Sequence, residues 1–199
     1  MCRSPQRPTS CQTFLRAHWG AFAGADFFTS EVWTWRGLVT FSTVFVIDLA
    51  TRRVQILGTT LDPDDAFLRQ VVRTLTMADA NPCQVLICDR DAKWSAAVRE
   101  RLEEAGIRVV HTPYAAPNAN AYAETFVRSI KEECLDRLIP LGERHFRQAV
   151  REYVAHYHFE RNHQGLDDAL IEGAPTTSGG RVHRQQRLGG LLNYYRRAA

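Results

Sequence analysis

The chain has 199 residues, of which 45% are hydrophobic and 24% charged, so it can bury one substantial core. No continuous apolar run reaches the ~18 residues of a membrane span, and the N-terminal residues contain no apolar signal core. The five cysteines form no CxxC pair, which argues against a zinc ribbon and against a disulfide framework. These features predict a cytoplasmic protein with one main domain and no membrane partner.

Charge is distributed unevenly along the chain, although the net charge is only +3. Residues 1–25 contain three arginines and residues 173–199 contain five, and neither segment contains an acid. The eight terminal arginines leave 17 basic and 22 acidic residues for residues 26–172, a net charge of −5. Basic ends around an acidic middle indicate a polyanionic partner and a cation-binding centre, although charged tails also occur on many globular proteins.

The first elements predicted along the chain are three strands. Residues 25–32 and 38–47 are rich in β-branched and aromatic residues, and a turn at Asp48 leads into a third strand at residues 54–57. Three consecutive strands joined by short turns predict an antiparallel meander.

The next elements alternate between helix and strand. Asp62 is expected to be the N-cap of a helix with one apolar face, followed by a strand at residues 84–89. A helix at 95–104 and a strand at 108–111 complete a strand–helix–strand unit, which implies parallel pairing.

Two long helices and a linker-like tail are predicted last. The helices cover about residues 121–138 and 143–161, and the Gly, Pro and Ser content from Gly173 onward resembles a linker to a short basic end. The whole pattern fits an α/β fold with a mixed five-stranded sheet, three antiparallel strands and then parallel ones, flanked by helices. The predicted organisation is an irregular segment at 1–24, a core domain at 25–172 and a basic C-terminal tail at 173–199.

Several carboxylates stand where α/β proteins place functional sites. Asp89 ends the apolar strand VLIC, and Asp91 lies two residues further on. Asp26 lies within the first strand, where an uncompensated buried charge is costly, and Glu124 lies in the first turns of a long helix. Taken singly, each is also explained as a turn or helix cap or as an acid at the positive end of a helix dipole.

Five stretches, in this order along the chain, carry a resemblance to a known family: AHWGAFAGADFF, FVIDLATRRV, LICDRDAKW, APNANAYAETFVRSIKEECLD and HYHFERNHQGL. Between about Phe14 and Leu170 the sequence resembles the DDE-type integrase catalytic core of bacterial insertion-sequence transposases, which is related to retroviral integrases. The resemblance implies a ribonuclease H-like fold. It also implies that Asp26, Asp89 and Glu124 are the catalytic and metal-binding triad, with 34 residues between the last two.

Function, cofactor and partners follow from this resemblance as expectations. It implies a Mg²⁺-dependent polynucleotidyl transferase that cleaves DNA and transfers strands by in-line attack on phosphodiesters, in DNA integration or transposition. Two Mg²⁺ ions, with Mn²⁺ as a substitute, suit a set of carboxylate oxygens. The expected partners are element ends and target DNA, further copies of the chain in a synaptic complex, and optionally a separate end-recognition subunit. The protein is then expected in the cytoplasm, associated with the nucleoid.

The chain departs from the family pattern in two places. The closing motif commonly reads Arg-Pro-His, whereas this chain has Arg161-Asn162-His163. Family members usually carry an N-terminal helix-turn-helix region, and only about 25 residues precede Asp26 here. Two alternatives therefore stand beside the enzyme: a truncated, non-catalytic DNA-binding remnant of a transposase, and a ribonuclease H-like nuclease outside transposition.

Candidate DNA-binding residues surround the triad. Arg128 and Lys131 follow Glu124 at i+4 and i+7, so the three side chains share one helix face. Arg128 fits an intrahelical ion pair equally well, and the resemblance to retroviral integrases favours Lys131 as the DNA contact. The other predicted contacts are Lys93, Asn118 and Asn120. The loop at 113–120 is expected to be a flap over the substrate.

Other polar residues have simpler interpretations. Asp48, the rival of Asp26, is expected to cap a hairpin turn, and Asp91, the rival of Asp89, to support local structure. The spacing of His156, His158 and His163 invites a zinc interpretation, but the first two would point apart on a helix. Metal binding is therefore not expected there, and His163 with Arg161 is expected to pack the last helix against the core.

Overall fold

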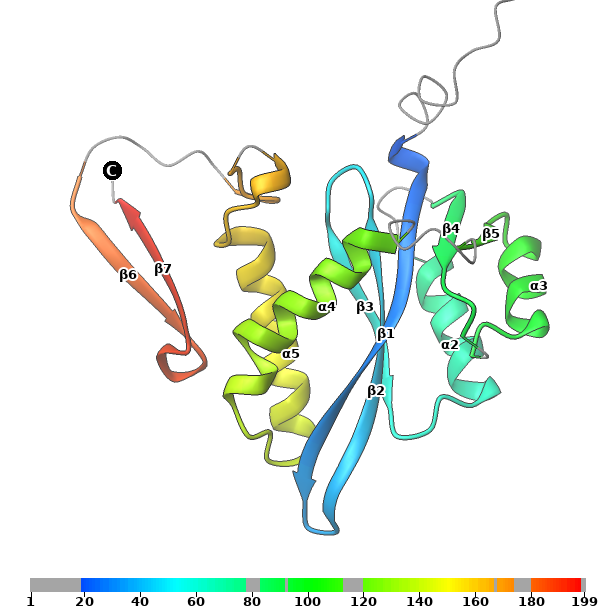
Figure 1. Cartoon of the computed structure of the whole chain (residues 1–199), viewed down its shortest axis with the longest axis horizontal. Coiled ribbons are helices and arrows are strands. Elements are labelled where there is room, and N and C mark those ends of the chain that lie inside the picture. Colours follow the sequence, from blue (N-terminus) through cyan, green and yellow to red (C-terminus); the bar gives the residue numbers. More distant parts are fainter. Residues whose placement is uncertain are drawn as a thin grey trace, which may run out of the picture.

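The structure is a computed structural model that describes residues 19–77, 83–91, 93–112, 120–166, 168–173 and 180–197. In this part of the chain, five strands form one mixed sheet in the order β3-β2-β1-β4-β5 (Figure 1). Its strands are β1 (Phe22–Thr34), β2 (Gly37–Asp48), β3 (Val54–Thr60), β4 (Val85–Cys88) and β5 (Arg108–His111). The first three pair antiparallel, and β4 pairs parallel with both β1 and β5. The predicted α/β fold, a mixed five-stranded sheet of three antiparallel strands and then parallel ones, flanked by helices, is confirmed.

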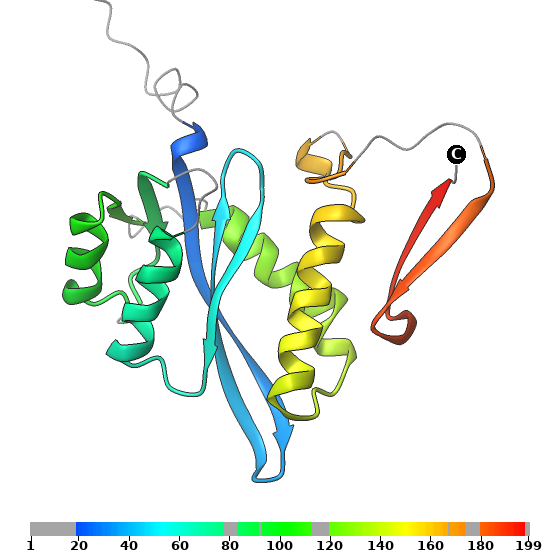
Figure 2. The same cartoon turned by 180° about the vertical axis from the view of Figure 1, so that it is seen from behind.

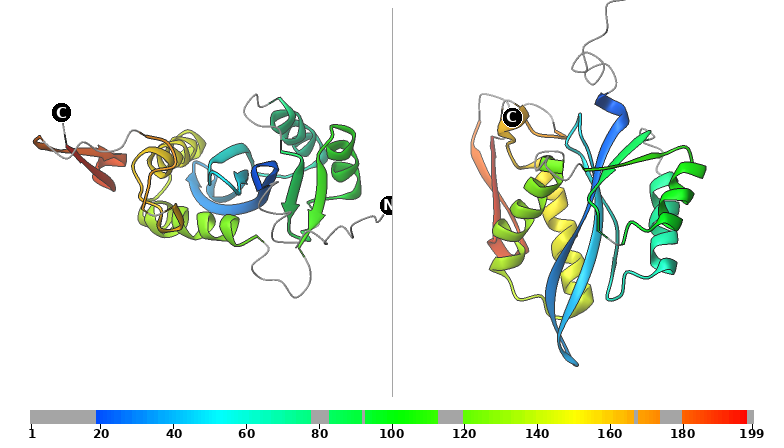
Figure 3. Two further views of the ribbon diagram at one scale, coloured as in Figure 1. Left: turned by 90° about the horizontal axis from the view of Figure 1, so that it is seen from above. Right: turned by 45° about the vertical axis from the view of Figure 1, so that its right-hand side comes forward.

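Helices cover both faces of this sheet (Figures 2 and 3). Helices α4 (Ala121–Glu133) and α5 (Gly142–Phe159) lie on one face, and α2 (Asp65–Thr76) and α3 (Ala96–Glu104) on the other. Four short 3-10 helices complete the described helical segments: η1 (Trp19–Ala21), η3 (Leu135–Arg137), η4 (Gln164–Leu166) and η5 (Leu188–Gly190). No helix in these described ranges is both long and apolar enough to cross a bilayer.

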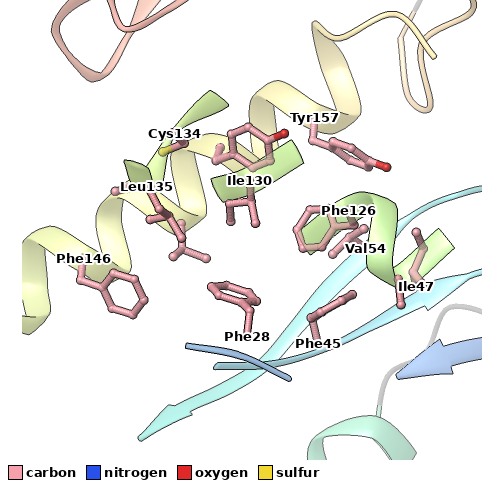
Figure 4. Packing of buried hydrophobic residues seen from close by; sticks show 14 of the residues in the cluster. Phe28, Phe45, Ile47, Val54, Phe126, Ile130, Cys134, Leu135, Phe146 and Tyr157 are labelled. Atoms are coloured by element: carbon pink, nitrogen blue, oxygen red, sulfur yellow. The ribbon is translucent and has the colours of Figure 1, made fainter. Parts of the chain in front are cut away.

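Each face of the sheet has its own hydrophobic core. On the α4/α5 face, aromatic rings dominate, and the ring centroids of Phe45 and Phe126 lie 4.8 Å apart (Figure 4). The opposite core is mainly aliphatic and includes Val44, Leu86 and Leu102. Burying one such side chain contributes roughly 1.5–3 kcal/mol, so the two cores fix the sheet between the two helical layers.

The start of helix α2 differs from the sequence prediction. Its N-cap is Asp64, whose Oδ1 accepts the backbone N–H of Phe67 at 2.8 Å, so the prediction of Asp62 was wrong. Asp62 belongs instead to a local turn, because the Thr60 hydroxyl donates to its carbonyl oxygen. Asp62 and Asp64 flank Pro63, and only the geometry of the turn decides which of them caps the helix.

The C-terminal segment contains a folded hairpin, which its linker-like composition did not predict. Strands β6 (Val182–Arg187) and β7 (Leu192–Arg197) pair antiparallel and form a separate two-stranded sheet. Leu192 is buried, and Leu188 and Leu191 pack against the core on the α4/α5 face. The hairpin is therefore attached to the main body of the protein.

Candidate active site

Asp26 and Asp89 lie on neighbouring strands at the same level of the sheet. The parallel pairing of β1 with β4 ends with Ala25 opposite Cys88, and the two aspartates are the next residues. Neighbouring strands are about 4.8 Å apart, so the register brings the two carboxylates close together.

The alternation of side chains along β1 gives the direction of Asp26, and Asp89 comes directly after the last residue of β4. Ala25 belongs to the core on the α2/α3 face. Successive side chains on a strand point to opposite faces, so Asp26 points toward the α4/α5 face. Phe28, two residues after Asp26, packs in the core on that face, as this alternation requires.

Helix α4 brings Glu124 to the same face of the sheet. Glu124 lies in the first turn of α4 and is exposed, while its neighbours Ala123 and Phe126 are fully buried in the core. The buried side chains hold the helix against the sheet, and Glu124 is left at the border of this contact.

The electrostatics of Asp26 show that these acids share one neighbourhood. Burial raises the pKa of Asp26 to about 6, although the N–H of Phe27, 2.7 Å from Oδ1, opposes the shift. Repulsion from Asp89, Glu124 and Asp91 contributes to the same shift. Three carboxylates therefore act on Asp26, and its negative form is disfavoured.

A divalent cation suits this donor set. Carboxylate oxygens are the ligands that Mg²⁺ prefers, and a cation relieves the burial and repulsion that raise the pKa of Asp26. Within the described ranges, however, no group of three or more His, Cys, Asp or Glu side chains is already positioned to hold a metal ion. The chemistry of the donors fits a metal, and Asp89 and Glu124 have to turn toward Asp26 to share one.

Asn120 ties the start of α4 to the strand that carries Asp26. Its side chain is 6% exposed, and Nδ2 donates to the carbonyl oxygen of Ala25 at 3.2 Å. A Cβ at Gly24 would lie 2.5 Å from Asn120 Oδ1, so only glycine leaves room for this contact. Asn120 was predicted to contact DNA, and its burial favours a positioning role instead.

His111 is a neighbour of the site that the sequence reasoning missed. Its Nδ1 lies 2.9 Å from the carbonyl oxygen of Asp89, and β5 places it opposite Cys88. The contact holds the backbone directly after β4. The sequence contained an indication of this contact, because two parallel strands that end at Cys88 and His111 place these two residues side by side.

The predicted cationic residues differ in their surroundings. Lys93 is hydrogen bonded to Asp91, and its Nζ lies 5.0 Å from the ring centroid of Phe27. Arg128 is exposed, whereas Lys131 is half-buried and lines a pocket beside Ser30 and Glu31 of β1, together with Asp136. Asn118 and the rest of the predicted flap, residues 113–119, lie outside the described residues.

The structure explains the rival aspartates locally. Asp48 Oδ1 accepts the N–H groups of Ala50 and Thr51 at 2.9 and 2.7 Å, which confirms it as a hairpin cap. Asp91 accepts hydrogen bonds from the backbone and side chain of Lys93, as expected for a residue that supports local structure.

The histidines and the closing motif pack α5 against its neighbours. Each histidine has a protein partner: His156 with Glu160, His158 with the N–H of Val54, and His163 with the carbonyl oxygen of Tyr157. Arg161 pairs with Glu133 of α4 at 2.9 Å. The packing of His163 and Arg161 is what the sequence predicted.

Two comparisons with known proteins bear on the chain. Residues 105–169 match the family model described as the integrase core domain, a range that contains Glu124 but neither Asp26 nor Asp89. A crystal structure of the catalytic core domain of BIV integrase is similar, with 13% sequence identity and a TM-score of 0.42. The similarity covers 57% of this chain and 68% of that one. No curated protein matches the chain.

Proposed function

We propose that the chain is the catalytic core of a DDE-type transposase or integrase, which cleaves DNA and transfers DNA strands. The observation that carries this proposal is the parallel register of β1 and β4, which makes Asp26 and Asp89 neighbours, with Asp26 on the face covered by the helix of Glu124. The electrostatic coupling of the three carboxylates supports it. The match of residues 105–169 to the integrase core domain supports it independently.

In this proposal Asp26, Asp89 and Glu124 hold two Mg²⁺ ions, with Mn²⁺ as a substitute, and Asp89 is shared between them. When bound, these ions supply Lewis acidity, which lowers the pKa of an attacking hydroxyl and offsets charge on the leaving oxygen. The protein supplies the positions: Asp26 comes from a central strand, and Glu124 comes from a helix whose start Asn120 fixes to β1.

The proposed substrate is DNA, as element ends and as target. In this proposal Arg128 and Lys131, which follow Glu124 along α4, bind phosphates beside the scissile one. Lys93 contributes to the site indirectly, because its ammonium group forms an ion pair with the Asp91 carboxylate. Because two DNA ends have to be joined to one target, we include further copies of the chain as partners, and a separate end-recognition subunit as an optional one.

Plasmid nicking tests the proposal. The protein is incubated with supercoiled plasmid and Mg²⁺ or Mn²⁺, and then with a labelled duplex that has free 3′-hydroxyls. Metal-dependent nicking and covalent joining of the label to the plasmid are expected, and both should be lost in Asp89→Asn. Nicking without joining would indicate a nuclease instead of a transferase.

A second candidate is a DNA-binding protein without catalysis. It is favoured by one observation: over the described ranges, no set of side chains is already positioned to hold a metal. This candidate predicts DNA binding that is indifferent to Mg²⁺, with no nicking at any metal concentration.

A further inference from the structure

The C-terminal hairpin is a basic surface, separate from the carboxylates of the proposed active site. Residues 173–199 contain five arginines and no acid. Four of these arginines are exposed: Arg181, Arg184, Arg196 and Arg197. Within the described part of the chain none of these four forms an ion pair, whereas the fifth, Arg187, forms two.

Arg187 fastens the hairpin to helix α5. Its guanidinium pairs with Glu152 at 2.7 Å and with Glu160 at 2.9 Å. Glu160 is only 7% exposed and also accepts a hydrogen bond from His156. Together with buried Leu192, these contacts hold the hairpin against the body, on the far side of α4 and α5 from β4 (Figures 1 and 3).

The strand register separates the hairpin into two faces. Arg187 pairs with Leu192, so the face they share is the one that packs on the body. Side chains alternate along each strand, so the neighbouring pairs belong to the opposite, outward face. That face consists of the pairs Val182 with Arg197, Arg184 with Tyr195, and Gln186 with Asn193.

The chemistry of the outward face suits a nucleic acid duplex. Guanidinium groups bind phosphate oxygens in a bidentate manner, and amide side chains pair with base edges. Tyr195 is 59% exposed, and Arg184 donates to Asn193 at 2.8 Å, which orders part of this face. A two-stranded ribbon also has dimensions that the DNA major groove admits.

We propose that the β6–β7 hairpin is a second DNA-binding surface, which holds duplex DNA at a site separate from the carboxylates. It rests on the proposed function for the choice of DNA as the polyanion. The hairpin binds DNA through Arg184 and Arg197 of the outward face, and the ion pairs of Arg187 keep it in a fixed position relative to the active site.

The test compares two double variants of the full chain that remove the same charge. One is Arg184→Gln, Arg197→Gln on the outward face of the hairpin. The matched control is Arg69→Gln, Arg73→Gln, two exposed arginines on α2. Binding of a fluorescent duplex is measured by anisotropy in EDTA across a range of salt concentrations, so that cleavage does not interfere.

The hairpin variant is expected to bind at least tenfold more weakly at low salt. The slope of log affinity against log salt should be shallower by about 0.9 for each lost phosphate contact, or roughly 1.8 for two. The control should stay within about twofold of the wild type at each salt concentration, with an unchanged slope. The single variant Arg197→Gln, at an exposed position, should lose about 0.9 of the slope and guards against misfolding of the double variant.

Equal weakening of both double variants would overturn the inference, because net charge alone would explain it. Unchanged DNA binding with an altered sedimentation coefficient in the hairpin variant would also overturn it and would make the hairpin a contact between protein copies. Plasmid nicking separates this result from the proposed function. If the wild type nicks plasmid and the hairpin variant binds DNA normally, only the proposed role of the hairpin is rejected. If the hairpin variant binds DNA more weakly but the wild type never nicks plasmid, only the proposed catalytic function is rejected.

Discussion

Asp26 is the carboxylate whose surroundings most disfavour its own charge. It lies on a central strand, and burial together with three neighbouring acids raises its pKa to about 6. A residue in this state gains from a bound cation more than an exposed acid does, because the cation offsets both the burial and the repulsion. The surroundings of Asp26 therefore support the proposed cation site.

This raised pKa predicts a pH dependence of metal binding. Below pH 6 the Asp26 proton competes with the metal, so Mn²⁺ affinity should fall by about tenfold per pH unit from this group alone. Above about pH 7 Asp26 is ionised without a metal, and the affinity should level off. Calorimetric Mn²⁺ titrations across this range measure the effect. A curve that falls only near pH 4, the usual range of an aspartate, would contradict the prediction.

Glu124→Gln should reduce DNA nicking by at least ~100-fold, since losing a metal ligand removes several kcal/mol of transition-state stabilisation. The fold and DNA affinity should be retained, because Glu124 is exposed. Glu132→Gln, an exposed acid further along the same helix, is the matched control and should keep full activity. Equal activities of the two variants in the plasmid assay would remove Glu124 from the mechanism.

At the residue scale, the motif resemblance predicts the triad Asp26, Asp89 and Glu124, and this assignment stays a prediction. The turn role of Asp48 was predicted from the sequence and is confirmed. The positioning contacts of Asn120 and His111 depend on which strands become neighbours. Such contacts follow from the register of the sheet, which a single sequence does not specify.

At the scale of elements, the approach of α4 to β1 determines the geometry of the site. Gly24→Ala should disturb this approach, because the added Cβ would meet Asn120 Oδ1 at 2.5 Å. We expect a loss of about 1–3 kcal/mol in stability. We also expect a loss of up to roughly 100-fold in nicking as Glu124 shifts.

Gly20→Ala is the matched control for this change, because no atom lies within 4 Å of its added Cβ. Its free energy of unfolding and its DNA-nicking activity should equal those of the wild type. Urea unfolding and the plasmid assay measure the two effects. Wild-type activity and stability in Gly24→Ala would show that the position of α4 does not depend on Asn120.

The contact between α5 and β3 predicts a pH dependence of stability. Burial lowers the pKa of His158, whose Nε2 accepts the N–H of Val54 at 2.9 Å. Below about pH 6.5 the unfolded chain takes up a proton that the folded protein rejects, so the free energy of unfolding falls as the pH decreases. Above that pH both states are neutral at His158 and this contribution is complete.

Urea unfolding between about pH 8 and pH 5 measures this effect, which is at most about 1.4 kcal/mol per pH unit for one histidine. His158→Gln should show a shallower slope. His183→Gln, which changes an exposed histidine of β6, should not. Identical slopes in the wild type and in His158→Gln would contradict the assignment.

The prediction of elements succeeded where hydrophobic patterns are strong and failed where contacts between distant segments decide. The strands of the main sheet and the helices on it were predicted from apolar spacing. The β6–β7 hairpin was not, because its residues VHRQQR and LNYYRR are largely polar and lack an apolar alternation. Its attachment depends on Arg187 meeting Glu152 and Glu160, which the sequence alone does not indicate.

At the scale of the whole molecule, the sheet and its helices carry the proposed active site, and a basic hairpin is fastened beside them. Burial would raise the pKa of Glu160, but hydrogen bonds from Arg187 and His156 outweigh it and the pKa lies below its usual value. The buried carboxylate is therefore ionised and depends on these partners.

Arg187→Ala should lower the free energy of unfolding by about 3 kcal/mol, because it leaves the Glu160 carboxylate buried without its guanidinium partner. Arg184→Ala, an exposed arginine of the same hairpin, should change it by less than about 0.5 kcal/mol. Urea unfolding measures both variants. Equal stabilities would show that the ion pair does not hold the hairpin.

The central claim is that one face of the sheet binds divalent metal through Asp26, Asp89 and Glu124. Anomalous diffraction from crystals of the protein soaked in Mn²⁺ tests it most directly. The expected result is at least one strong peak within about 2.5 Å of carboxylate oxygens from both Asp26 and Asp89, with Glu124 turned toward it. Peaks elsewhere on the molecule, with these three carboxylates free of metal, would contradict it.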